Sequence, residues 1–144
     1  MGKMNSLEKI TLSPLKEIKT DGGNVLHCLR EYEDSFIGFG EAYFSWVNIN
    51  AIKAWKKHNH MKMNLVVPVG SVRFVFASDD FKHFREEIIG VDRYFRLEVP
   101  PGIWFGFQGI KAPSNLVLNI ANIPHSPEEV ERNDLSSINF SWEV

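Results

Sequence analysis

A chain of 144 residues has the usual length of one domain and can bury a substantial core. Its net charge of −2 gives no bulk field that would favour nucleic acid or an anionic membrane, and no apolar run approaches the roughly 20 residues of a membrane span. The single cysteine, Cys28, excludes an internal disulfide, and the first residues lack the apolar segment of a signal peptide. We therefore expect a cytoplasmic protein without nucleic-acid or membrane partners.

The first 35 residues are predicted to form an N-terminal arm. Their apolar residues are scattered and interrupted by Pro14, so we expect only one or two short strands. The sequence Asp-Gly-Gly-Asn at residues 21–24 predicts a turn, because Gly and Asn tolerate positive φ. A short strand is expected directly after it.

From residue 36 to residue 142 the chain alternates between apolar and polar residues in short runs that end at Gly, Pro or Asn. Residues 81–89 fit either a strand or one helical turn, and residues 124–133 fit a loop with a helical turn at 127–130. The remaining strands are expected at residues 42–47, 52–60, 65–68, 71–77, 94–99, 103–107, 116–121 and 138–142. Nine or ten short strands without a long helical period predict an all-β sandwich or barrel, with residues 1–144 as a single domain.

The run at residues 52–60 carries the candidate catalytic side chains. Period-two alternation predicts one face that starts apolar and ends basic, formed by Ile52, Ala54, Lys56, His58 and His60. The other face would hold Lys53, Trp55, Lys57 and Asn59. This pattern is typical of a strand that runs from the core into a polar cavity. We predict that Lys56, with its pKa lowered by neighbouring positive charge, and the imidazoles of His58 and His60 act there, with His125 as a further candidate.

His58 and His60 also have the H-x-H spacing of a metal site on one strand. In metal-binding cupin barrels a carboxylate follows this pair and a second strand supplies a third imidazole. Here Asn64 stands in the carboxylate position and Phe105 in the imidazole position. We expect no bound metal or other cofactor, and a metal-dependent cupin that uses His58 and His60 is the alternative.

Several short motifs in register resemble the dTDP-4-dehydrorhamnose 3,5-epimerase family. They are GFGEAYF at 38–44, IKAWK at 52–56, VPVG at 67–70, VPPGIWFGF at 99–107, ND at 133–134 and SW at 141–142. The resemblance covers residues 36–142. It implies a double-stranded β-helix, or jelly-roll cupin barrel, at 36–142, with the arm at 1–35 contributing to a homodimer, and a nucleotide-linked sugar as the ligand.

The resemblance also implies roles for individual residues. Lys53 keeps the positive charge used near the diphosphate, Lys56 stands where the family has its histidine base, and Asn119 stands where it has its tyrosine acid. The substrate-binding candidates are Lys53, Arg73, Asn64, Asn119, Glu41, Trp55 and Trp104. Plainer interpretations remain open: a solvated lysine at 56, a turn histidine at 125, an outward-facing Arg73, buried core aromatics at Trp55 and Trp104, and a solvated acidic loop at 128–131.

The resulting prediction is an epimerase or isomerase that acts on a nucleotide-linked 4-keto-6-deoxy sugar in deoxysugar or polysaccharide biosynthesis. It would remove a proton from a carbon next to the ketone, using Lys56 and His58. The alternative is a non-catalytic cupin of the same fold that binds a sugar nucleotide.

Overall fold

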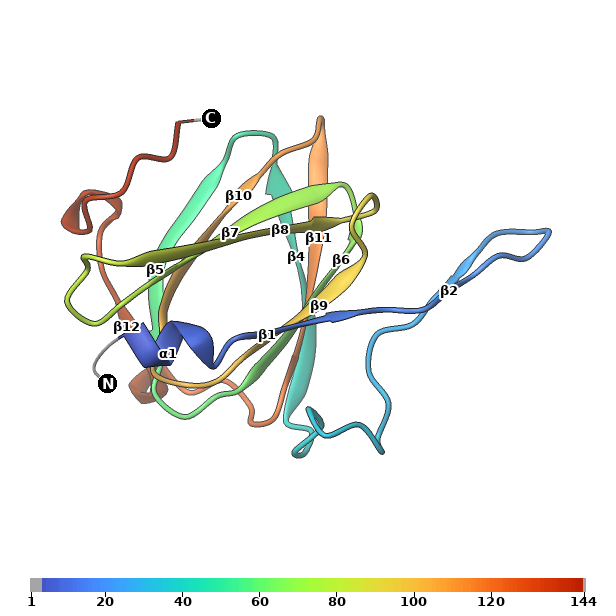
Figure 1. The fold of residues 1–144 in the computed structure, drawn as a ribbon, viewed down its shortest axis with the longest axis horizontal. Coiled ribbons are helices and arrows are strands. Elements are labelled where there is room, and N and C mark those ends of the chain that lie inside the picture. The colour runs from blue at the N-terminus through green and yellow to red at the C-terminus, as the bar shows by residue number, and fades with distance from the viewer. Residues whose placement is uncertain (1–3, 144) are drawn as a thin grey trace.

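The computed structural model describes residues 4–143, which form two five-stranded antiparallel sheets and a separate hairpin (Figure 1). The first sheet has the strand order β1 (Thr11–Pro14), β9 (Phe95–Val99), β6 (Met63–Val69), β11 (Ser114–Ala121), β4 (Glu41–Asn48). The second has the order β12 (Val130–Arg132), β5 (Ile52–His58), β10 (Trp104–Gly109), β7 (Ser71–Ala77), β8 (Phe84–Gly90). This arrangement confirms the predicted all-β jelly-roll barrel, and the ambiguous run near residues 81–89 is strand β8.

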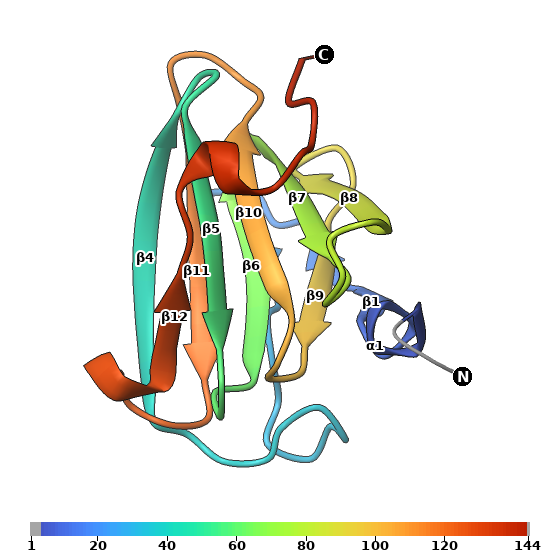
Figure 2. The same ribbon diagram turned by 90° about the vertical axis from the view of Figure 1, so that its left-hand side faces the viewer.

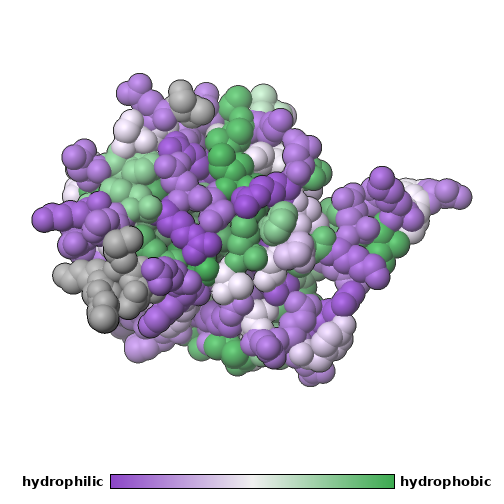
Figure 3. Space-filling view, in the orientation of Figure 1, coloured by the Kyte–Doolittle hydropathy of each residue, from purple (hydrophilic) through white to green (hydrophobic). Residues whose placement is uncertain are grey.

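Residues 4–14 belong to the barrel rather than to an arm. Leu7 of helix α1 (Met4–Glu8) and Ile10 are buried in the core, and β1 pairs with β9 at the edge of the first sheet. Within residues 4–143, the hairpin of β2 (Glu17–Ile18) and β3 (Val25–Leu26) projects from the body (Figure 1), and Figure 3 shows a small hydrophobic group on it among hydrophilic residues. Among the helices of residues 4–143, none is long and apolar enough to cross a membrane.

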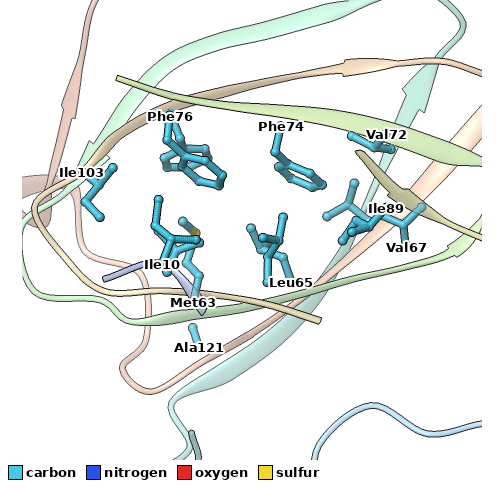
Figure 4. Packing of buried hydrophobic residues seen from close by; sticks show 14 of the residues in the cluster. Ile10, Met63, Leu65, Val67, Val72, Phe74, Phe76, Ile89, Ile103 and Ala121 are labelled. Atoms are coloured by element: carbon cyan, nitrogen blue, oxygen red, sulfur yellow. The ribbon is translucent and has the colours of Figure 1, made fainter. Parts of the chain in front are cut away.

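The core lies between the facing surfaces of the two sheets. Phe74 and Phe76 of β7 point toward Met63 and Leu65 of β6, as Figure 4 shows. Because side chains alternate across a strand, the inward residues of each strand form this layer and the intervening ones face outward. The two phenylalanines are completely buried in this core.

A second apolar layer covers the outer face of the second sheet, where the chain after β12 runs across it (Figure 2). The strand predicted at 138–142 is wrong. These residues follow the 3₁₀ helix η2 (Leu135–Ser137) without strand pairing and are held by side chains. The guanidinium of Arg73 donates to the carbonyl oxygen of Trp142 at 3.1 Å and lies over the ring of Phe140 at 5.3 Å. We call residues 133–143 the strap.

Candidate active site

A β-bulge in β5 determines which side chains of this strand face inward. Lys56 pairs with Phe105 of β10, while Ala54 pairs with the next residue of β10, Gly106. Trp55 is therefore an extra residue between two paired positions. A bulge of this kind shifts the alternation by one residue, so side chains on its two sides do not follow a single period of two.

The predicted faces of β5 are wrong on the N-terminal side of this bulge. Lys53 pairs with the inward-facing Phe107, so it shares the inner face with Lys56 and His58 instead of opposing them. Ile52 and Ala54 pack with Trp55 in the outer apolar layer. The bulge thus collects three basic side chains on one inner face.

A cavity of about 580 Å³ opens where β5 and β12 of the second sheet lie across from β4 of the first sheet. Its basic lining residues are Lys53 and Lys56 of β5 and Arg132 of β12. Arg132 pairs with Lys56 in the strand register, so both start from the same inner face. Phe105 and Phe107 of β10 give the cavity an aromatic wall. A cationic mouth beside an aromatic wall suits an anionic ligand with a planar group.

His58 and Glu129 form a buried pair at the end of β5. The His58 Nδ1 atom lies 2.8 Å from Glu129 Oε1, and both side chains are 4% exposed. Glu129 Oε2 accepts hydrogen bonds from the backbone N–H groups of His60 and Met61, each at 2.7 Å. A carboxylate that accepts from Nδ1–H leaves Nε2 with its lone pair, and this buried atom has no partner in the described part of the chain. The imidazole stacks on Phe105, with ring centroids 5.9 Å apart.

The environment keeps this pair in the form of a neutral imidazole and an ionised carboxylate. Burial lowers the pKa of His58, the hydrogen bond and charge of Glu129 oppose this, and the positive charges of Lys56 and His125 lower the pKa further. Burial alone would raise the pKa of Glu129, but its hydrogen bonds from His58 and two backbone amides outweigh burial and hold the pKa below its usual value. His58 therefore holds a neutral imidazole near neutral pH; it lies behind Phe105 rather than among the residues that line the cavity.

The structure separates His58 from His60. Strand β5 ends at His58, and the chain then turns so that the His60 amide reaches Glu129, while the His60 side chain is exposed. The predicted pairing of the two imidazoles on one face is therefore wrong. No group of three His, Cys, Asp or Glu side chains within residues 4–143 is arranged to hold a metal ion.

Three predicted substrate-binding side chains lie away from the cavity. Arg73 is on the outer face of the second sheet, where it pairs with Glu86 and holds the strap. Trp104 packs in the outer apolar layer. Trp55 packs in the same layer but also lines the cavity, so it does not belong to these three. Asn64 is on the outer face of the first sheet and donates to the Ser35 carbonyl oxygen at 3.4 Å. For Arg73 and Trp104, alternation alone could not decide which side faces the cavity, because both faces of the second sheet are covered by apolar groups.

Comparison with known proteins identifies the family through one solved structure of high sequence identity. No protein-family model and no curated protein matches the chain. Among solved structures, a dTDP sugar isomerase from Desulfovibrio desulfuricans G20 is 38% identical, with a TM-score of 0.88 over 94% of this chain and 91% of that one. The chain belongs to the dTDP-sugar isomerase and epimerase family of cupins.

Structures with lower sequence identity share the fold. The sugar 3,4-ketoisomerase QdtA from Thermoanaerobacterium thermosaccharolyticum, solved with TDP, is 16% identical, with a TM-score of 0.75 over 88% of this chain and 90% of that one. A dTDP-4-dehydrorhamnose 3,5-epimerase from Elizabethkingia anophelis NUHP1 is 11% identical, with a TM-score of 0.76 over 95% of this chain and 82% of that one. At such identities the likeness shows the barrel alone.

In this dTDP-sugar isomerase family member, the residue at the expected acid position is joined to a tyrosine on the neighbouring strand. Asn119 of β11 is buried on the inner face, and its side-chain amide donates to the Tyr43 hydroxyl at 3.1 Å. Tyr43 lies on the same face of β4 as Ser45, which lines the cavity. The other β4 candidate, Glu41, begins that strand opposite Ala121, and His125 lies in the exposed loop before the 3₁₀ helix η1 (Pro127–Glu129).

The sequence prediction missed two residues of this family member's site, Glu129 and Arg132. The acidic run around Glu129 was expected to be a solvated loop, but its carboxylate is buried against His58. Val130, Glu131 and Arg132 form an apolar-polar-polar run that is too short for a period-two pattern, so the local sequence carries no signal for this strand. Only its pairing with β5 reveals which residues it brings together.

Proposed function

We propose that this protein is an epimerase or isomerase that removes a proton from a carbon next to the ketone of a nucleotide-linked 4-keto-6-deoxy sugar. The observation that carries the proposal is the buried His58–Glu129 pair, whose imidazole stacks on Phe105, a wall residue of the cationic cavity. A general base needs a neutral, oriented imidazole, and Glu129 supplies the orientation.

The remaining groups suit the other requirements of such a substrate. Lys53 and Arg132 offer the positive charge that a diphosphate needs, and Arg can bind two phosphate oxygens at once. Tyr43, held by Asn119, is a phenol that can return a proton from the β4 side of the cavity. Tyr43 thus replaces the tyrosine acid that the 3,5-epimerase family has at the position of Asn119.

Family members with known ligands support this substrate class. One QdtA structure contains TDP, and a variant of the same 3,4-ketoisomerase contains TDP-4-keto-6-deoxyglucose. Both ligands join an aromatic base to a diphosphate, which matches the aromatic wall and cationic mouth of this cavity.

Solvent deuterium exchange tests the proposed function. The purified protein is incubated in D₂O with dTDP-, GDP- and CDP-linked 4-keto-6-deoxy sugars, and NMR follows the protons on the carbons that flank the ketone. We expect deuterium at one or both carbons for at least one nucleotide. Binding without exchange across the panel would refute catalysis and leave a sugar-nucleotide-binding cupin.

We further propose that two copies associate through the outer face of β4 and β11. Phe44 and Trp46 of β4 are 62% and 58% exposed there, next to Leu118 and Leu116 of β11. The β2–β3 hairpin has two residues in each strand, and such a short hairpin is marginal in water unless it packs on another surface. A second copy would cover the apolar face and support the hairpin.

Sedimentation at micromolar concentration should therefore give a dimer, and Phe44→Glu should give a folded monomer. Ile88→Glu is the matched control, since Ile88 is also an exposed strand residue but belongs to β8 of the other sheet. A monomeric unsubstituted protein, or equal dissociation by both substitutions, would contradict this interface.

A further inference from the structure

Lys56 differs in its surroundings from the neighbouring lysines of β5. Its side chain is partly buried and lines the cavity, and none of the ion pairs within residues 4–143 involves it. Lys57, one residue later, points to the outer face, where its Nζ lies 3.5 Å from Glu131 and 5.4 Å from the ring centroid of Trp104. Lys53 donates to the carbonyl oxygen of Trp46.

The groups around Lys56 make its ammonium ion easier to deprotonate than that of an ordinary lysine. The pKa of Lys56 is lowered, mainly because burial removes water from the amine. The positive charges of Arg132 and then Lys53 on the same face lower it further. A lysine that is desolvated beside other cations is the typical environment of an amine that attacks a carbonyl carbon. The aromatic wall of Phe105 lies directly across the strand register from it.

We propose that Lys56 is a covalent catalytic residue that forms an imine with the ketone of the bound sugar, an inference that rests on the function proposed above. The site would then hold the diphosphate with Lys53 and Arg132, and bond the keto carbon to Nζ of Lys56. Lys56 stands where the 3,5-epimerase family has its histidine base. The proposal gives this position a nucleophile in place of a base.

The steps balance without an oxidant or a metal. The neutral amine attacks the carbonyl carbon, the resulting hydroxyl takes up one proton from solvent and leaves as water, and a positively charged iminium forms. This charge acidifies the C–H bonds on the adjacent carbons, and His58 Nε2 takes one of these protons to give a neutral enamine. Return of a proton to the opposite face restores the iminium, and addition of water releases the inverted sugar, the amine of Lys56 and the proton taken up in the first step.

This route also limits the product. The amine must leave from the carbon that it attacked, so the ketone returns to its original position. The proposal therefore specifies inversion at a carbon beside the ketone, as an epimerase performs, rather than movement of the ketone along the ring. NMR of the product distinguishes the two outcomes.

Reductive trapping tests the imine. The protein is mixed with dTDP-4-keto-6-deoxyglucose and sodium cyanoborohydride, which reduces an iminium to a stable secondary amine. We expect the mass of the intact protein to rise by the mass of the sugar nucleotide less one oxygen atom, with the added mass on Lys56 in peptide mapping. Lys56→Arg keeps the positive charge but should lose the adduct, and Lys57→Arg should keep it.

Each outcome decides the proposal, because deuterium exchange is measured on the same samples. Exchange without an adduct, or an adduct that persists in Lys56→Arg, would overturn the imine and leave the proposed function standing. An adduct on Lys56 without exchange would support the covalent site and overturn proton removal. Absence of both would overturn both.

Discussion

Replacing His58 with asparagine should slow deuterium exchange into the keto sugar by about 10²–10⁴-fold, the usual contribution of a general base. Asparagine can still donate a hydrogen bond to Glu129, but it has no basic nitrogen in place of Nε2. NMR exchange rates measure the effect. His83→Asn is the matched control, because His83 is exposed and belongs to the turn before β8. An exchange rate that falls equally in both variants, or in neither, would contradict the role of His58.

The rate of deuterium exchange should depend on pH through the protonation of the His58 imidazole. Only neutral His58 can accept a proton, so the rate must fall as the pH drops through the pKa of this residue. Burial and the nearby charges of Lys56 and His125 lower that pKa from the ordinary value of 6.5, so the acid limb should lie below pH 6.5. An acid limb at or above pH 6.5 would show that the limiting neutral group is not His58 but another group, such as the amine of Lys56.

The fold was largely predictable because most of its strands show period-two alternation and are flanked by turn residues. Residues 71–77 place Val72, Phe74 and Phe76 on one face, and turn residues precede and follow them, as in β7 of the structure. The run at 138–142 has similar aromatic content but forms the strap instead of a strand. Side-chain contacts from Arg73 hold it there, and no local pattern reports such contacts.

The site was predictable only in part, because two non-local features define it. Period-two alternation cannot foresee the bulge at Trp55, which moves Lys53 to the inner face with Lys56. The partner of His58 comes from 71 residues further along the chain, so no spacing rule connects the two. Sequence reasoning identified the basic side chains of β5, and pairing with β12 was needed to reveal the carboxylate and Arg132 beside them.

Replacing Glu129 with alanine should lower the free energy of unfolding by about 3–5 kcal/mol, as expected when one partner of a buried pair is removed. The carboxylate accepts hydrogen bonds from His58, His60 and Met61, and all three donors would lose their acceptor, two of them in a buried position and His60 in a partly buried one. Urea unfolding measures the loss. Glu128→Ala should leave the unfolding midpoint unchanged, because the neighbouring Glu128 is exposed.

Glu129→Gln separates the structural role of this residue from its role in positioning His58. The amide can still accept through one oxygen, so we expect a smaller loss of about 1–2 kcal/mol. Without the negative charge, the pKa of His58 should fall further, since the charge and hydrogen bond of Glu129 are the groups that raise it. The acid limb of exchange should therefore move to lower pH as the rate falls. If the substitution lowers stability but leaves both the rate and the limb unchanged, Glu129 supports the fold alone and another group must orient the base.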